Sequence, residues 1–244
     1  MRDAREPALE IRLTAAAVGA VALLAPFGLI AFLVVRNVGW LHRFDLAVTD
    51  ALHRYVAMHP GWVHFLNACS TIFAPLTWRV AAALVVLWLL RRRAWPLACW
   101  VAVTMTAGGM LGALLKLLVG RHRPALLDPV AQAPGYSFPS GHALNSALGA
   151  VVLLLVLRPL VPRRPAPRGV LWLAAVAIPL VTGISRIALG VHWTSDVVAG
   201  WLLGVAVPVV TAMALLTWQG RRTDEFRVRG RSDSRRPLIR REVP

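Results

Sequence analysis

The stretch from Leu13 to Val35 reads LTAAAVGAVALLAPFGLIAFLVV and contains no charged side chain. About 20 mostly apolar residues are enough for a helix to cross the roughly 30 Å hydrocarbon core of a bilayer. The run is also too long for the apolar core of a cleaved signal peptide. It therefore predicts a retained transmembrane helix near the N-terminus, and it places the chain among membrane proteins.

The remainder of the chain repeats this pattern. Its hydrophobic content of 57% is more than a soluble domain of 244 residues usually carries. We expect an all-α, polytopic bundle over residues 1–218, in which Pro75 breaks or kinks the second helix. The mixed segment Arg36–Pro60 is expected to be an amphipathic connector at the membrane interface. The six predicted spans are Leu13–Val35, Gly61–Leu90, Trp95–Val119, Ala143–Leu157, Val170–Ile184 and Ser195–Trp218.

The net charge of +16 comes almost entirely from arginine, because Lys116 is the only lysine. Long apolar runs separate the arginine clusters, as in loops that flank membrane spans, and no basic face for nucleic acid emerges. With six spans, the positive-inside rule places both termini in the cytoplasm and the segments 36–60, 120–142 and 185–194 outside the inner (plasma) membrane. The arginine-rich tail, residues 219–244, is predicted to be disordered and to rest on anionic lipid.

Three polar segments interrupt the apolar pattern. They are Lys116–Pro124 (KLLVGRHRP), Phe138–His142 (FPSGH) and Ser185–Asp196 (SRIALGVHWTSD). By the span count, all three lie at the outer boundary of the membrane. Side chains that are distant in the sequence are therefore expected to meet at the extracytoplasmic rim of the bundle.

Cations and a helix start in these segments suit a phosphate group, which carries up to two negative charges. Lys116, Arg123 and Arg186 supply positive charge, and each arginine can bind two phosphate oxygens at the same time. Pro139 to Gly141 predict the start of a helix, where free backbone N–H groups and the helix dipole favour an anion. The hydroxyl of Ser140 adds one more donor.

A nucleophile is predicted at His192. Asp196 follows it by four positions, so the two side chains share one helix face. A carboxylate on one imidazole nitrogen fixes the tautomer and stabilises the charge that develops when the other nitrogen attacks. His142 is then available to protonate a leaving alkoxide. Metal hydrolysis would need more carboxylates nearby, so we expect no metal and no cofactor.

The three segments resemble the motifs of the type 2 phosphatidic acid phosphatase family, which includes undecaprenyl pyrophosphate phosphatases and vanadium haloperoxidases. The pattern is Lys, six residues, Arg-Pro; then Pro-Ser-Gly-His; then Ser-Arg, five residues, His, three residues, Asp. The match has no gap or substitution across residues 116–196. The resemblance implies a metal-independent helical bundle and a phosphohistidine at His192, with Asp196 orienting it and His142 as general acid. It implies phosphate binding by Lys116, Arg123, Ser140, Gly141 and Arg186.

Each of these residues, taken singly, also has a purely structural interpretation. Lys116 is then a snorkelling lysine, Ser140 a helix cap, and His192 with Asp196 a helix-locking pair. All of these residues occur together, in the order of the motifs and at one predicted face of the membrane, which favours the functional interpretation. Arg121 and His122 lie outside the fixed motif positions and are expected to face solvent at the headgroup level rather than bind substrate. Three further side chains receive structural predictions: Tyr136 and Trp193 as interfacial anchors, and Arg79 as a snorkelling or packed residue.

The predicted function is a membrane lipid phosphatase acting on a phosphate monoester or a pyrophosphate. Undecaprenyl pyrophosphate is favoured by analogy over phosphatidic acid and phosphatidylglycerol phosphate. The same residues would also serve a lipid-linked phosphotransferase. A non-enzymatic, anion-binding transporter is disfavoured because the charges cluster at one face, and a haloperoxidase because those relatives are soluble. The expected partners are lipids and not nucleic acid, and the oligomeric state stays open.

Overall fold

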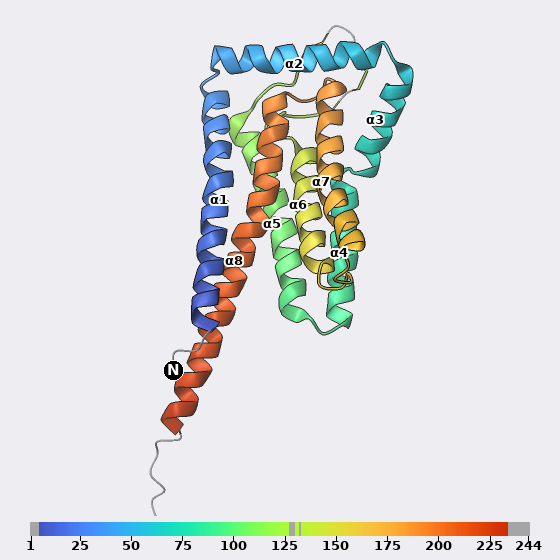
Figure 1. Cartoon of the computed structure of the whole chain (residues 1–244). Coiled ribbons are helices and arrows are strands. Elements are labelled where there is room, and N and C mark those ends of the chain that lie inside the picture. The colour runs from blue at the N-terminus through green and yellow to red at the C-terminus, as the bar shows by residue number, and fades with distance from the viewer. Residues whose placement is uncertain (1–4, 127–129, 132, 234–244) are drawn as a thin grey trace, which may run out of the picture.

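The chain is all-helical in the part that the computed structural model describes, residues 5–126, 130–131 and 133–233 (Figure 1). Side chains are described within residues 14–218. The all-α prediction is confirmed, since the described residues form no strand. In chain order the helices are α1 Arg5–Val35, α2 Gly39–Ala57, α3 Pro60–Ile72, α4 Pro75–Arg91, α5 Trp95–Val119, α6 Gly141–Leu157, α7 Pro165–Ala188 and α8 Thr194–Asp233.

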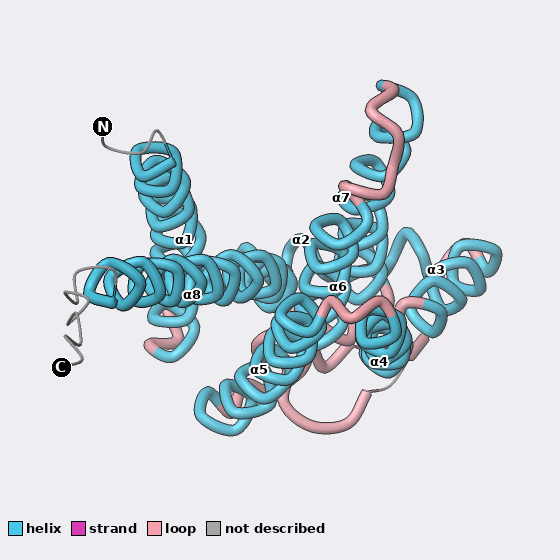
Figure 2. Tube along the Cα trace, turned by 90° about the horizontal axis from the view of Figure 1, so that it is seen from below, coloured by secondary structure: helices cyan, strands magenta, loops and turns pink. Residues whose placement is uncertain are grey.

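Five helical segments of the described chain are long and apolar enough to cross a membrane. They are Thr14–Val35, Pro60–Arg91, Trp95–Val119, Pro165–Ala188 and Thr194–Trp218. The remaining predicted span, α6, is apolar but has only 17 residues. Because α6 packs against α4, α5, α7 and α8, it lies in the middle of the bundle and is buried along much of its length (Figure 2). The count of six spans therefore stays a prediction.

The second predicted span is divided in two. α3 ends at Ile72, and α4 starts at Pro75, which occupies the first helical position. Proline is favoured there because its missing N–H would be unpaired in any case, whereas inside a helix it removes a hydrogen bond. The predicted break at Pro75 is confirmed.

Helix α2 lies across one end of the bundle (Figure 1). The connector was predicted as an amphipathic helix, and α2 has such a face, since its buried side chains recur at every third or fourth position. These are Leu41, Asp45, Thr49, His53 and Val56. The middle three are polar, so α2 turns polar groups towards the bundle end and not only apolar ones.

Two glycines on α8 let this helix approach α6 closely. A Cβ atom at Gly200 would lie 2.8 Å from the carbonyl oxygen of Ser140, and one at Gly204 would lie 2.5 Å from that of Leu144. Small residues four apart are a common device for close helix contact in membranes. The contact sets the start of α6 beside the start of α8, and these two helix ends carry the second and third motifs.

The N-terminal end of α1 and the C-terminal end of α8 lie at the opposite end of the bundle from α2 (Figure 1). The α4–α5 and α6–α7 connections lie at that end as well. The span count predicted that these arginine-rich segments share one side. Which side of a membrane this is stays a prediction. Where a disordered tail was expected from residue 219, the backbone of α8 is helical as far as Asp233. Residues 234–244 lie outside the described part.

Candidate active site

The third motif occupies the turn between α7 and α8. The N–H groups of Val191 and His192 both donate to the carbonyl of Arg186, at 3.1 and 3.2 Å, and Gly190 supplies the positive φ of 73° that the turn needs. His192 lies two residues before α8, and Asp196 lies in the first turn of that helix. Nδ1 of His192 is 3.4 Å from Oδ2 of Asp196, and both side chains are buried.

Burial keeps the His192 imidazole neutral. It lowers the pKa of His192 from 6.5 to about 4, because the charged form loses its hydration. The Asp196 carboxylate opposes this shift in the pKa, and the nearby charges of Arg123 and Lys116 add to it. At neutral pH the ring therefore holds one proton, which the carboxylate of Asp196 favours on Nδ1. The Nε2 atom then carries the lone pair, 3.0 Å from Nη1 of Arg123.

The first motif places two cations beside this imidazole. Lys116 lies in the last turn of α5, and its Nζ donates to the carbonyl of Tyr136 at 2.6 Å. Arg123 follows in the loop after α5 and reaches across to the third motif, where Nη1 donates to the carbonyl of Val191 at 2.6 Å. The same guanidinium donates to the carbonyls of Gly135 and Pro134 at 2.9 and 3.0 Å. Arg123 therefore fixes the connection between α5 and α6 to the turn that carries His192.

The second motif forms the start of α6, as predicted. Ser140 is the N-cap residue and Gly141 the first helical residue. The backbone N–H of Ser140 donates to the carbonyl of Asp196 at 3.0 Å, which joins this motif to the third. His142 lies in the first turn, within electrostatic range of Arg186 and His192, and is hydrogen-bonded to the backbone of Ser70.

Arg186 is the most deeply buried of the three expected cations, with an exposed fraction of 7%. It lies in the last turn of α7, and its Nη1 donates to the hydroxyl of Ser70 on α3. Its buried Nε has no hydrogen-bond partner among the described residues. An unpaired buried donor in a cation calls for an explanation, and an anionic ligand is one that fits.

Contacts connect the three motifs into one cluster at the end of the bundle under α2. The carbonyl of Tyr136 accepts from both Lys116 and Arg123, at 2.6 and 3.3 Å. A Cβ atom at Gly141 would lie 3.9 Å from Cε of Lys116, so the start of α6 faces this lysine. The structure thus brings together all eight residues selected from the sequence, Lys116, Arg123, Ser140, Gly141, His142, Arg186, His192 and Asp196.

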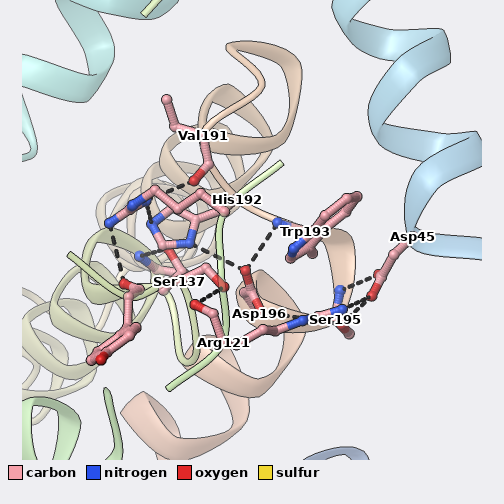
Figure 3. A network of polar contacts seen from close by, with 12 residues as sticks. Asp45, Arg121, Ser137, Val191, His192, Trp193, Ser195 and Asp196 are labelled. Carbon is pink, nitrogen blue, oxygen red and sulfur yellow. Dashed lines mark hydrogen bonds and ion pairs between the residues drawn. The ribbon is translucent and has the colours of Figure 1, made fainter. Parts of the chain in front are cut away.

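Arg121 occupies a place that the sequence did not predict. It was expected to face solvent, but its side chain is only 14% exposed and pairs with two buried carboxylates. Nη1 lies 2.7 Å from Oδ1 of Asp196, and Nη2 lies 2.7 Å from Oδ2 of Asp45 (Figure 3). The prediction is wrong because two carboxylates buried without a cation would be strongly destabilising. Helical periodicity within α2 could have flagged Asp45, which aligns with Leu41 and Thr49.

Two aromatic residues of the site differ in their surroundings. Trp193 was expected to be an interfacial anchor, but it is 7% exposed, and its Nε1 donates to the carbonyl of His122 at 2.9 Å. That prediction is wrong, because the turn before α8 folds the indole under the guanidinium of Arg121, 5.4 Å from the ring centroid. Tyr136 is 40% exposed, and its role as an anchor stays a prediction.

Metal ligands are sparse in the described residues. No group of three or more His, Cys, Asp or Glu side chains there could hold a metal ion. The carboxylates of the site, Asp45 and Asp196, are each already bonded to Arg121. Metal independence stays a prediction that chelation can test.

Sequence comparison gives the family of this chain. The sequence model of the PAP2 superfamily matches residues 97–222, which is more than half of the chain and includes all three motifs. The chain belongs to the PAP2 superfamily. This agrees with the resemblance drawn from the motifs.

Curated relatives of this PAP2 chain are lipid phosphatases. It is 35% identical over 99 residues to an undecaprenyl-diphosphatase of Sulfolobus acidocaldarius, an alignment of 38% of this chain and 42% of the relative. It is 34% identical over 91 residues to phosphatidylglycerophosphatase B of Bacillus subtilis, which covers 37% of this chain and 44% of that protein. The matches thus span less than half of the length of these two relatives.

Solved structures share the fold of this PAP2 chain. A transmembrane PAP2 type phosphatidylglycerolphosphate phosphatase from Bacillus subtilis aligns with a TM-score of 0.70 and 23% identity, over 79% of this chain and 94% of that one. LpxE from Aquifex aeolicus aligns with a TM-score of 0.51 and 22% identity, over 69% and 94%. Together with the apolar helices, this makes the chain an integral membrane protein with a PAP2 fold.

Proposed function

We propose that this PAP2 protein hydrolyses a phosphate monoester or pyrophosphate on a membrane lipid through a phosphohistidine at His192. The observation that carries the proposal is the environment of that imidazole. It is buried and neutral, one nitrogen faces Asp196, and the other lies 3.0 Å from Nη1 of Arg123. A neutral imidazole with an orienting carboxylate and a cation beside the attacking atom is the arrangement that nucleophilic attack on phosphorus requires.

The anion is held by Lys116, Arg123 and Arg186 and by the start of α6. Phosphate oxygens would take over the N–H of Arg123 that now faces Nε2 of His192, which frees the lone pair for attack. Another oxygen would accept from the buried Nε of Arg186, which has no partner among the described residues. The backbone N–H of Gly141 and the hydroxyl of Ser140 add uncharged donors at the positive end of the helix dipole.

The reaction has two steps. Nε2 of His192 attacks phosphorus, the bond to the leaving oxygen breaks, and the imidazolium form of His142 gives its proton to that oxygen. Burial and the nearby charge of Arg186 lower the pKa of His142 to about 3, and the negative charge of the bound phosphate opposes this shift. Asp196 stabilises the imidazolium that forms. Water then attacks the phosphohistidine, His142 accepts a proton from this water, and free phosphate leaves while Nε2 regains its lone pair.

The substrate is proposed to be a lipid whose tail stays in the bilayer while its headgroup reaches the rim of the bundle. The charge distribution supports an outward-facing site with both termini in the cytoplasm of the plasma membrane. We favour undecaprenyl pyrophosphate, and phosphatidic acid and phosphatidylglycerol phosphate are the two other candidates. The names of the relatives, an undecaprenyl-diphosphatase and a phosphatidylglycerophosphatase, support lipid phosphates as the substrate class.

Phosphate release by the purified full-length protein tests the proposal. Each of the three lipids is presented in detergent micelles without any acceptor alcohol, and His192→Ala serves as the inactive control. We expect free phosphate from at least one lipid with the wild type and background release with the variant. If release requires an added alcohol, the protein is a phosphotransferase. Comparable release by His192→Ala would show that the nucleophile is another residue.

A further inference from the structure

Asp45 on α2 is the residue of the site that lies farthest from the motifs in the sequence. Its side chain is fully buried and makes three hydrogen bonds (Figure 3). Oδ1 accepts from the backbone N–H of Ser195 at 2.8 Å. Oδ2 accepts from the Ser195 hydroxyl at 2.5 Å and from Nη2 of Arg121 at 2.7 Å. Asp45 therefore joins α2 to the first turn of α8, next to Asp196.

Arg121 completes a bridge between the two carboxylates. Its Nη1 donates to Oδ1 of Asp196 and to the hydroxyl of Ser195, both at 2.7 Å. The planar guanidinium lies over the ring of Trp193, with its Cζ 5.4 Å from the ring centroid. The guanidinium is bonded to a carboxylate on each side and covered by an indole ring on one face, so it has little freedom to rotate.

This bridge determines which oxygen of Asp196 faces the nucleophile. Arg121 occupies Oδ1, so that Oδ2 is left to the imidazole of His192 at 3.4 Å and to the backbone N–H of Trp193 at 3.0 Å. Rotation of the carboxylate would break these bonds together. The plane of Asp196, and with it the orientation of the His192 ring, therefore depends on Arg121.

Asp45 also sets the charge of this network. Asp196 and Arg121 alone would form a neutral pair, which would stabilise a developing imidazolium weakly. With Asp45 the three groups carry a net charge of −1, which the imidazolium of the first reaction step neutralises. In a buried site, where charges are screened little, one such unit of charge has a large effect on the barrier.

We propose that Asp45 and Arg121 are positioning residues for the His192–Asp196 pair, which fix the Asp196 carboxylate and supply the negative charge that the attacking imidazole needs. The inference rests on the proposed function and extends it to α2, which precedes the 97–222 segment matched to the superfamily. Because both side chains are bonded within this network, neither is expected to contact the phosphate. The effect is therefore expected in turnover and not in substrate binding.

Asp45→Asn is the decisive variant, because it removes the charge while it keeps the shape. Asp50→Asn is the matched control, since Asp50 lies on the same helix but its side chain is 41% exposed and, within the described part of the chain, forms its ion pair with Arg54, at 2.9 Å. We expect Asp45→Asn to lower kcat by about tenfold or more while KM changes less than about twofold, as for an interaction made mainly in the transition state. Trapping of the phosphohistidine should show slower formation. Asp50→Asn should match the wild type.

A double-variant cycle separates positioning from general destabilisation. Arg121→Gln should lower kcat as well, and Asp45→Asn with Arg121→Gln should be no slower than Arg121→Gln alone, because the two residues act as one unit. Unfolding temperatures in detergent show whether each sample is folded. The inference is overturned if Asp45→Asn keeps the wild-type kcat, or if its loss only follows the unfolded fraction. Absence of phosphate release from the wild type would overturn the proposed function together with it.

Discussion

Nε2 of His192 lies 3.0 Å from Nη1 of Arg123, so the proposed attacking atom and one proposed phosphate ligand are direct neighbours. The turn after α7 and the loop after α5 bring them there, and the carbonyl of Val191 holds the guanidinium in place at 2.6 Å. A phosphate bound by Arg123 would therefore have its phosphorus within reach of the imidazole without a rearrangement of either helix.

His142→Ala should lose activity in a way that depends on the leaving group. The alkoxide that leaves phosphatidic acid or phosphatidylglycerol phosphate needs a proton as it departs, whereas p-nitrophenolate does not. We expect a loss of about a hundredfold or more on the lipid phosphate but a much smaller loss on p-nitrophenyl phosphate. His192→Ala, in contrast, should be inactive on both compounds. An equal loss on both substrates for His142→Ala would remove this residue as the general acid.

Ser70→Ala should weaken substrate binding more than turnover. The hydroxyl of Ser70 is a hydrogen-bond partner of Nη1 of Arg186, which would otherwise be less well fixed. We expect KM to rise about fivefold, as for the loss of about 1 kcal/mol from one positioned hydrogen bond. Ser146→Ala is the control, because that buried hydroxyl donates to the carbonyl of Ala143 in its own helix and has no other partner among the described residues. An unchanged KM in Ser70→Ala would show that Arg186 does not need this contact.

Gly200→Ala and Gly204→Ala should destabilise the fold, although alanine is usually the better helix former. The new Cβ atoms would lie 2.8 Å from the carbonyl oxygen of Ser140 and 2.5 Å from that of Leu144, and backbone cannot move aside as a side chain can. We expect a cost of about 1–3 kcal/mol for each, measured by thermal unfolding in detergent. Gly28→Ala on α1 is the control, since a Cβ there meets nothing within 4 Å, and it should be neutral or stabilising. Equal stability of all three variants would contradict the close α6–α8 contact.

The free energy of unfolding should decrease as the pH is lowered, and His192 should cause part of this decrease. The pKa of His192 in the folded protein is about 4, against 6.5 for the unfolded chain, because burial disfavours the charged ring. Between pH 6.5 and 4 the unfolded state therefore binds the extra proton, and stability decreases as the pH is lowered through this window. Unfolding curves at several pH values should show a smaller decrease for His192→Gln than for the wild type. Parallel curves would mean that burial does not shift this histidine.

Chelation should leave activity largely intact. The proposed chemistry uses an imidazole nucleophile, cationic side chains and helix N–H groups, and no step needs a bound metal ion. Phosphate release after extensive dialysis against EDTA should therefore match that of the untreated enzyme. Complete loss of activity that a divalent ion restores would argue against the mechanism.

Most of the helices and the candidate site residues could be predicted from the amino-acid sequence alone. Hydropathy and proline positions are local properties, so they predicted most of the helices, the break at Pro75 and the helix start after Ser140. The motif spacing selected His192, Asp196 and the six other candidate site residues. In a helix or a tight turn, the spacing in the sequence determines the direction in which each side chain points. Belonging to the PAP2 superfamily followed from the same residues.

The contacts that hold these residues in place could not be predicted without the tertiary structure. Arg121 pairs with Asp45 and Asp196, which are 76 and 75 positions away in the sequence, and Arg186 bonds Ser70 across 116 positions. No periodicity within one helix encodes such pairs. They exist because α2 crosses the end of the bundle and α3 descends beside α7, so that buried charges from separate helices must find partners where the helices meet.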